Sequence, residues 1–223
     1  MPPKLIQTPS PNHDSREGHA VDILLLHYTG MPSGEMALSR LRDPAAKVSA
    51  HYVVEEDGRV FHLVPEDRRA WHAGISSWLG ESNINQRSIG IEIVNPGHEF
   101  GYRAFPGMQM KAVLDLSLGI IARHAIPAAR VIGHSDVAPQ RKEDPGELFD
   151  WQGLAKAGVG VWPSPKPVQW SDDAFFAALQ RYGYDISDRA AVTRAFCRHF
   201  RQSRVSDAPD AELAAILNGL FGR

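Results

Sequence analysis

Cysteine is almost absent from this chain of 223 residues, which contains Cys197 alone. No internal disulfide can therefore form, and a cysteine-rich metal site is excluded. Any metal ion must be bound by histidine and carboxylate side chains. Cys197 falls among Phe196, His199 and Phe200 on a helical pattern, which is typical of a buried structural thiol rather than a nucleophile.

An excess of charge is also lacking, because 24 basic and 26 acidic residues give a formal net charge of −2. That balance provides no electrostatic attraction for nucleic acid or an anionic membrane surface, and we expect neither as a partner. No apolar run approaches the roughly 20 residues needed to cross a bilayer, so no transmembrane segment is expected. The oligomeric state is left open.

The first twenty residues lack the apolar core and the small-residue cleavage site of a secretory signal. This favours a cytoplasmic protein. The alternative is a periplasmic or outer-membrane-associated protein whose leader has been removed.

Strand-like and helical patterns alternate along the first two thirds of the chain. Asp57-Gly58 lies between two strand-like runs and is typical of a hairpin turn. Strands are predicted at 20–28, 51–55, 59–64, 88–94 and 130–132, and helices at 35–42 and 108–124. The predicted fold class is α/β (α+β), with a mixed central β-sheet flanked by helices.

The composition changes after residue 157. Residues 158–167 contain three prolines and two glycines, which favour a stiff, extended linker. Beyond it, Ser171 can cap the first of three predicted helices. We therefore predict a first domain at 1–159, a linker at 160–170 and a small three-helix module at 171–223.

Two histidines and one carboxylate form the candidate metal site. His27 ends an apolar strand, His134 follows the short strand at 130–132, and Asp144 lies ten residues further in a loop-rich segment. Such positions allow a rigid scaffold to bring ligands together. Two imidazoles and a carboxylate leave a fourth position open for water, as in catalytic zinc sites. Each residue alone has an ordinary structural explanation, namely a hydrogen-bonded core histidine, a loop histidine and a turn aspartate.

Glu92 and Lys142 extend this set. The alternation in 88–94 puts Glu92 on the strand face opposite three isoleucines. Either that face is solvated, or Glu92 is a general base whose pKa is raised by partial burial. Lys142 could stabilise an oxyanion, although a solvated loop lysine is the commoner case.

Six short motifs occur in an order that resembles zinc-dependent N-acetylmuramoyl-L-alanine amidases of the AmpD/AmiD type. That family shares its fold with T7 lysozyme and peptidoglycan-recognition proteins. The motifs are Leu26-His27-Tyr28-Thr29, Ser49-Ala50-His51-Tyr52, Ala70-Trp71-His72-Ala73-Gly74, Ser88-Ile89-Gly90-Ile91-Glu92, Gly133-His134-Ser135-Asp136 and Lys142-Glu143-Asp144-Pro145-Gly146.

The resemblance implies one zinc ion per chain, bound by His27, His134 and Asp144. It assigns Glu92 as general base and Lys142 as oxyanion stabiliser. It also places four residues around the substrate groove, namely His51, Trp71, His72 and Asn83.

The implied reaction is hydrolysis of the amide between N-acetylmuramic, or 1,6-anhydro-N-acetylmuramic, acid and L-alanine in peptidoglycan or muropeptides. The C-terminal module resembles a peptidoglycan-binding domain. Two rival interpretations are a non-catalytic peptidoglycan-recognition module and a serine hydrolase using Ser135. The second is disfavoured because Ser135 lacks the Gly-x-Ser-x-Gly elbow.

Overall fold

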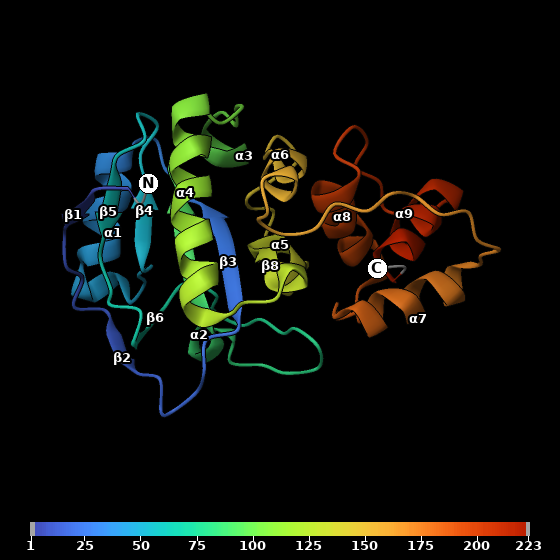
Figure 1. Ribbon diagram of the computed structural model, residues 1–223, viewed down its shortest axis with the longest axis horizontal. Helices are drawn as coiled ribbons and strands as arrows, with labels where there is room; N and C mark the ends of the chain where they lie inside the picture. Colours follow the sequence, from blue (N-terminus) through green and yellow to red (C-terminus); the bar gives the residue numbers. More distant parts are fainter. Residues whose placement is uncertain (1–2, 222–223) are drawn as a thin grey trace.

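The computed structural model describes residues 3–221. Figure 1 shows the strands of a sheet lying side by side, a long helix in front of them, and three C-terminal helices beside the sheet. The strands are β1 (Leu5–Gln7), β2 (His13–Ser15), β3 (Ile23–Tyr28), β4 (Tyr52–Val54), β5 (Val60–His62), β6 (Arg68–Ala70), β7 (Ser88–Ile93) and β8 (Val131–Gly133). The helices are α1 (Gly34–Arg42), η1 (Pro44–Ala46), α2 (Ile84–Arg87), α3 (Gly97–Phe100), α4 (Gly107–His124), η2 (Ala128–Arg130), α5 (His134–Val137), α6 (Trp151–Lys156), α7 (Asp172–Tyr182), α8 (Arg189–Phe200) and α9 (Ala211–Phe221).

The main sheet has six strands in the order β1-β5-β4-β7-β3-β8. The β4–β5 hairpin is antiparallel, whereas β4, β7, β3 and β8 are parallel neighbours. The predicted mixed sheet flanked by helices is thus confirmed. Because the parallel strands end at the same edge, the residues at their carboxyl ends lie close together.

Alternation in β7 separates an apolar face from a polar one. Ile89, Ile91 and Ile93 are fully buried and belong to a hydrophobic cluster that includes residues of α4 and α6. Glu92 consequently points to the opposite face, as its place between the isoleucines predicts. On that face, α1 contributes Leu41 to a smaller cluster over β4 and β5.

The first of the three C-terminal helices begins where the sequence predicts. Ser171 accepts a hydrogen bond from the backbone N–H of Ala174 and caps α7, and Gly183 follows its last residue. The segment between α6 and α7 has no regular secondary structure, but Val159 and Val161 in it are buried in hydrophobic clusters. The division into domains at 1–159 and 171–223 with a linker at 160–170 stays a prediction.

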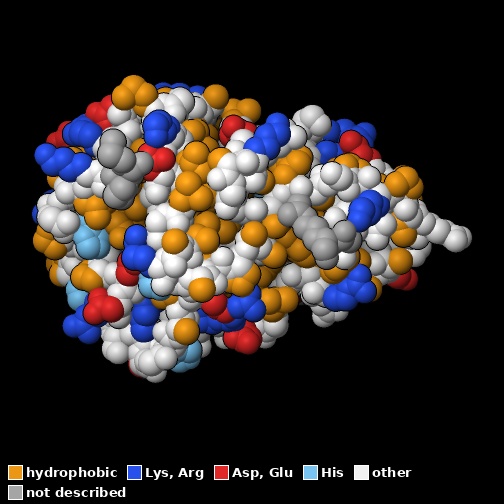
Figure 2. Space-filling view, viewed as in Figure 1, with side chains coloured by type: hydrophobic (Ala, Val, Ile, Leu, Met, Phe, Trp, Pro, Cys, Tyr) orange, Lys and Arg blue, Asp and Glu red, His pale blue; other side chains and the backbone are white. Residues whose placement is uncertain are grey.

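The surface has both charge signs. Figure 2 shows acidic and basic side chains interspersed over the face in view, in keeping with the net charge of −2. Cys197 is buried, as predicted. Between residues 3 and 221, no helix is both long and apolar enough to cross a membrane.

Candidate active site

The register of the parallel strands brings the candidate metal ligands together. His27 pairs directly with Glu92 across β3 and β7. Leu26 pairs with Gly133, so His134, the next residue after β8, emerges beside His27. The loop after α5 then returns to this point, where the carbonyl of Asp144 accepts a hydrogen bond of 2.9 Å from the backbone N–H of Ser135.

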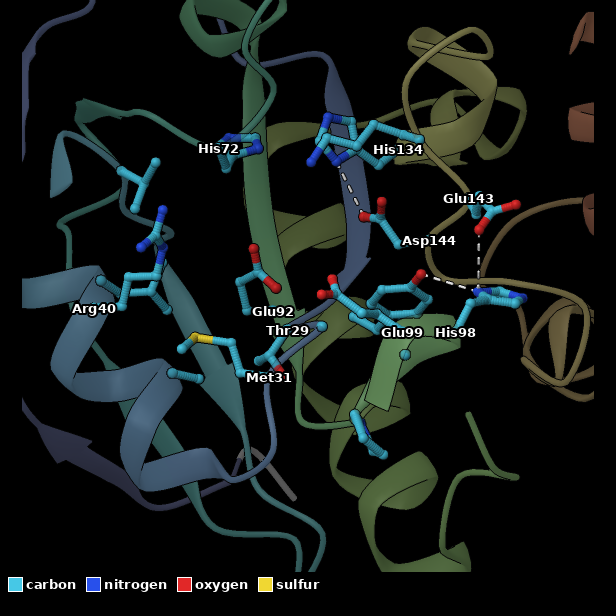
Figure 3. A pocket seen from close by; sticks show the side chains of 18 of the residues that line it. Thr29, Met31, Arg40, His72, Glu92, His98, Glu99, His134, Glu143 and Asp144 are labelled. Carbon is cyan, nitrogen blue, oxygen red and sulfur yellow. Dashed lines mark hydrogen bonds and ion pairs between the residues drawn. The ribbon is translucent and has the colours of Figure 1, made fainter. Parts of the chain in front are cut away.

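His27, His134 and Asp144 meet at one buried point, and Figure 3 shows the side chain of His134 beside that of Asp144. The Nδ1 atoms of the two histidines are 2.9 Å apart, and Oδ2 of Asp144 lies 3.1 Å from the first and 3.0 Å from the second. All three residues are at most 5% exposed. The structure therefore brings the three candidate metal ligands together.

The hydrogen bond made by the second ring nitrogen of His134 shows which tautomer of the imidazole is present. Nε2 of His134 lies 3.0 Å from the carbonyl oxygen of Ala73. A carbonyl only accepts hydrogen bonds, so Nε2 carries the proton. In the neutral ring, the lone pair of Nδ1 then points at the site.

A series of hydrogen bonds determines in the same way which ring nitrogen of His27 carries the proton. Oγ of Ser88 donates to the carbonyl of Ile84 at 2.7 Å and therefore accepts from Nε2 of His72 at 3.3 Å. Nδ1 of His72 is left to accept from Nε2 of His27 at 3.0 Å. The lone pair of His27 Nδ1 is thus also directed at the site. The lack of a side chain at Gly90 leaves space for these hydrogen-bonded rings, because a Cβ there would come within 2.5 Å of the His72 ring.

This donor set fits a metal ion. Three electron-pair donors so close together repel one another unless a cation lies among them. Burial, reinforced by His134, lowers the pKa of His27 to about 4, so the ring is in the neutral form that binds metals. Burial alone would raise the pKa of Asp144, but His134 and His27 outweigh it and hold the pKa below its usual range. The cluster could therefore bind a metal ion, and two imidazoles with one carboxylate suit zinc.

Glu92 provides a proton acceptor next to this cluster. Its carboxylate points from β7 toward Asp144 and His134 (Figure 3). Its Oε2 atom is enclosed and has no hydrogen-bond partner among the described residues. Burial and the nearby charge of Asp144 raise the pKa of Glu92 well above its usual value, against the smaller opposing effect of Lys142. A carboxylate whose pKa is raised is a stronger base than an ordinary carboxylate and therefore a better proton acceptor.

These groups open into a cleft of about 410 Å³. Arg40 of α1 contributes to its lining, as do Trp71, His72, Glu92 and Lys142. Figure 3 shows Arg40 on the side opposite the loop that carries Asp144. No hydrogen bond or ion pair joins the Arg40 side chain to another residue in the described part of the chain. The cleft thus combines a possible metal site, a raised carboxyl pKa and an available cation.

Of the four residues expected around the groove, Trp71 and His72 line the cleft. His51 and Asn83 are not among its lining residues. His51 is fully buried, and its Nδ1 accepts a hydrogen bond from the backbone N–H of Gly90 at 2.9 Å. Asn83 is exposed and precedes α2 in the left-handed backbone region.

Sequence reasoning missed Arg40 and Ser88. A basic residue in the last turn of a helix is common for electrostatic reasons, so the pattern of α1 does not single out Arg40. The contact of Ser88 with His72 joins residues of different elements and has no local sequence pattern. Ser135 is buried, and among residues 3–221 no hydrogen bond joins its hydroxyl to a histidine.

Comparison with known sequences finds one family over the part of the chain that contains these residues. The family model of N-acetylmuramoyl-L-alanine amidases (Amidase_2) matches residues 17–147. N-acetylmuramoyl-L-alanine amidase AmiD of Escherichia coli K12 is 36% identical over 230 residues, covering 90% of this chain and 82% of that protein. The 1,6-anhydro-N-acetylmuramyl-L-alanine amidase AmpD of Citrobacter freundii is 33% identical, covering 65% and 85%.

Solved structures resemble the whole fold. The complex of E. coli AmiD with the substrate anhydro-N-acetylmuramic acid-L-Ala-D-gamma-Glu-L-Lys matches with a TM-score of 0.81 and 35% identity, covering 98% of this chain and 92% of that one. AmpDh3 from Pseudomonas aeruginosa matches with a TM-score of 0.82 and 33% identity, covering 95% and 93%. At this coverage the likeness includes the C-terminal helices as well as the sheet.

Proposed function

This chain belongs to the family of N-acetylmuramoyl-L-alanine amidases, and from that premise we propose that it hydrolyses the amide between the lactyl group of N-acetylmuramic acid and L-alanine with one zinc ion held by His27, His134 and Asp144. The observation that carries the zinc assignment is the meeting of three buried electron-pair donors within 2.9–3.1 Å. Zinc bound there supplies Lewis-acid chemistry, which polarises the scissile carbonyl and promotes ionisation of water near neutral pH.

Glu92 is the general base in this proposal. Its carboxylate accepts a proton from the attacking water and later delivers it to the nitrogen of the leaving alanine. Support comes from its enclosed, unpaired Oε2 and from the burial that raises its pKa. A pure recognition module would have no need of a desolvated carboxyl group beside the ligand cluster.

Lys142 stabilises the oxyanion. It lines the cleft two residues before Asp144. Its charge lowers the pKa of Glu92 against the effect of burial, and it lowers the pKa of His27 in the same direction as burial. An ammonium group placed in this way donates to the negative oxygen that develops on the carbonyl. One good donor of this kind contributes roughly 3–4 kcal/mol to transition-state stabilisation.

Arg40 binds a carboxylate of the stem peptide. The peptide in the AmiD complex contains a γ-linked glutamate, whose α-carboxylate is free. Arg40 has no partner of its own among the described residues and lines the same cleft. We expect Arg40→Ala to raise KM more than it lowers kcat. An unchanged KM for a muropeptide with a free carboxylate would contradict this role.

The substrate class is a muropeptide or peptidoglycan strand, with either N-acetylmuramic or 1,6-anhydro-N-acetylmuramic acid at the scissile bond. Turnover of N-acetylmuramyl-L-Ala-D-γ-Glu and of its anhydro form, followed as newly formed amino groups, distinguishes the two. A preference for soluble anhydro forms would favour a recycling role. A preference for intact wall would favour remodelling.

Metal removal tests the central assignment. We expect chelation to abolish turnover and stoichiometric Zn²⁺ to restore it. His134→Ala should not be restored by zinc, whereas the control His19→Ala, which changes an exposed histidine outside the cleft, should behave like the wild type. Full activity after complete metal removal would refute the mechanism. Binding of the muropeptide without any turnover would identify a recognition module instead.

A further inference from the structure

A buried carboxylate links the metal-binding loop to the C-terminal helices. Asp136 lies in α5, two residues after His134, and is 1% exposed. Its Oδ1 accepts a hydrogen bond of 2.6 Å from the hydroxyl of Tyr184, and its Oδ2 accepts one of 2.7 Å from Nδ1 of His199. Oδ2 also accepts the backbone N–H of Gly133 at 2.7 Å. Two of these three donors therefore come from the C-terminal part of the chain.

These bonds hold the junction between β8 and α5. The bond to Gly133 joins Asp136 to the residue from which His134 departs. A buried carboxylate is stable only while its oxygens are satisfied by donors. Burial and the charge of Asp136 raise the pKa of Tyr184 well above its usual value, so its hydroxyl stays protonated and donates.

A second link lies at the other end of the same loop. Arg198 of α8 is largely buried and donates to Oε1 of Glu143, the residue before Asp144, at 2.5 Å. The side-chain amide of Gln202 donates to the carbonyl of Phe149 at 2.6 Å. The segment formed by α5 and the loop after it, which carries His134, Lys142 and Asp144, is therefore held on both sides.

Hydrophobic packing makes this connection continuous. One buried cluster contains Ile132 and Val137 from the sheet side together with Phe196 of α8 and other residues of α7–α9. Gly183 lies so close to Trp78 that a Cβ would come within 2.6 Å of the indole. Figure 2 shows a continuous surface from the sheet to these helices on the face in view. The C-terminal helices are thus packed against the sheet rather than tethered beside it.

We propose that Tyr184, His199 and Arg198 are positioning residues for the metal site, so that the metal affinity of the enzyme depends on its C-terminal helices. The inference rests on the proposed zinc function. Loss of a hydrogen bond made directly to a metal ligand typically weakens metal binding by about 10- to 100-fold, and these three residues act one contact further away, through Asp136 and Glu143. A module whose only role is to bind cell wall would have no such effect.

The test uses the full chain, because a truncation before α7 would also open the shared hydrophobic cluster. Tyr184→Phe removes one hydroxyl and keeps the ring, so Oδ1 of Asp136 loses its donor. The Kd for Zn²⁺ is measured by competition with a chromogenic chelator, and the melting temperature of the metal-free protein is measured in parallel. Because Tyr184 acts on His134 through Asp136 and Gly133, we expect zinc binding to weaken by up to about tenfold, and turnover at low zinc to recover as zinc is raised.

Phe196→Leu is the matched control. It reduces packing in the same shared cluster without removing a donor to Asp136, so it should lower the melting temperature while leaving the Kd for zinc unchanged. Arg198→Gln, which removes the ion pair with Glu143, should weaken zinc binding as Tyr184→Phe does. An unchanged Kd in both Tyr184→Phe and Arg198→Gln would overturn the proposal. Equal losses of zinc affinity in Phe196→Leu and Tyr184→Phe would also overturn it, because the effect would then follow stability alone.

Zinc binding by the wild-type protein distinguishes a failure of this positioning role from a failure of the zinc mechanism on which it rests. A wild-type protein that binds no zinc refutes the zinc mechanism itself. A wild-type protein that needs zinc for turnover, with variants of unchanged affinity, refutes only the positioning role of the C-terminal helices.

Discussion

Replacing Glu92 by glutamine should separate catalysis from metal binding. Glutamine has nearly the same volume as glutamate, and Glu92 is not one of the three residues whose ligand atoms form the candidate metal site. We therefore expect Glu92→Gln to fold and to bind zinc with wild-type stoichiometry. Turnover should fall by about 10² or more, which is the usual scale of lost general base catalysis.

The same substitution should change how stability depends on pH. Burial raises the pKa of Glu92 well above 4.5 in the folded protein, so the folded state holds a proton that the unfolded state releases. The stabilisation is present below about pH 4.5 and is lost as the pH rises toward the pKa of the folded group. Between these two values one such group lowers the free energy of unfolding by up to about 1.4 kcal/mol per pH unit. Glutamine does not ionise, so this contribution to the slope disappears.

The assay is denaturant unfolding of chelated protein at a series of pH values, combined with turnover of the zinc-loaded protein. The control is Glu35→Gln, which changes an exposed carboxylate in the first turn of α1. We expect Glu92→Gln to become more stable than the wild type as the pH rises, and Glu35→Gln to follow the wild-type slope. Near-normal turnover of Glu92→Gln would refute its role as base. Loss of zinc from that variant would make Glu92 a ligand.

Three further predictions concern the ligand set, its hydrogen-bond chain and acid stability. His134→Ala should lose most of its zinc and all activity, and stoichiometric zinc measured by atomic emission would contradict its assignment as a ligand. Ser88→Ala removes the acceptor for His72 Nε2, so zinc affinity should fall by about tenfold in chelator competition; an unchanged Kd would show that the chain does not orient His27. Burial would raise the pKa of Glu66, but hydrogen bonds, the largest from Arg123, lower it to about 2, so its stabilisation is present above pH 4.5 and is lost as the pH falls toward about 2. Glu66→Gln should therefore remove about 2 kcal/mol at neutral pH, after allowance for solvent screening, and unfold with a shallower acid dependence in denaturant melts.

Much of the local structure could be predicted from the chain. Period-two alternation identified β7 and the face on which Glu92 lies, and Asp57-Gly58 marked the turn between β4 and β5. Ser171 marked the start of α7. These features depend on residues near one another in sequence, so periodicity, turn chemistry and capping are sufficient to predict them.

The convergence of His27, His134 and Asp144 was inferred from the types of residue and from the family resemblance, not from any local rule. Only the tertiary structure decides that β3 lies between β7 and β8, which brings the three ligand atoms together. Strand order and register are set by pairings between distant segments, and a hydrophobic pattern alone specifies a face without specifying a neighbour.

The same limit applies to the contacts around the ligands. The hydrogen bonds from Ser88 through His72 to His27, and the bond from Tyr184 to Asp136, join residues 16 to 48 positions apart. Their donors and acceptors are ordinary polar groups, and their hydrogen-bond partners are defined only after folding. The sequence by itself thus determined the elements, the buried faces and the donor types. Only the tertiary structure decided which donors share one point and which helices hold them there, because hydrogen bonding and burial depend on neighbours that folding brings together.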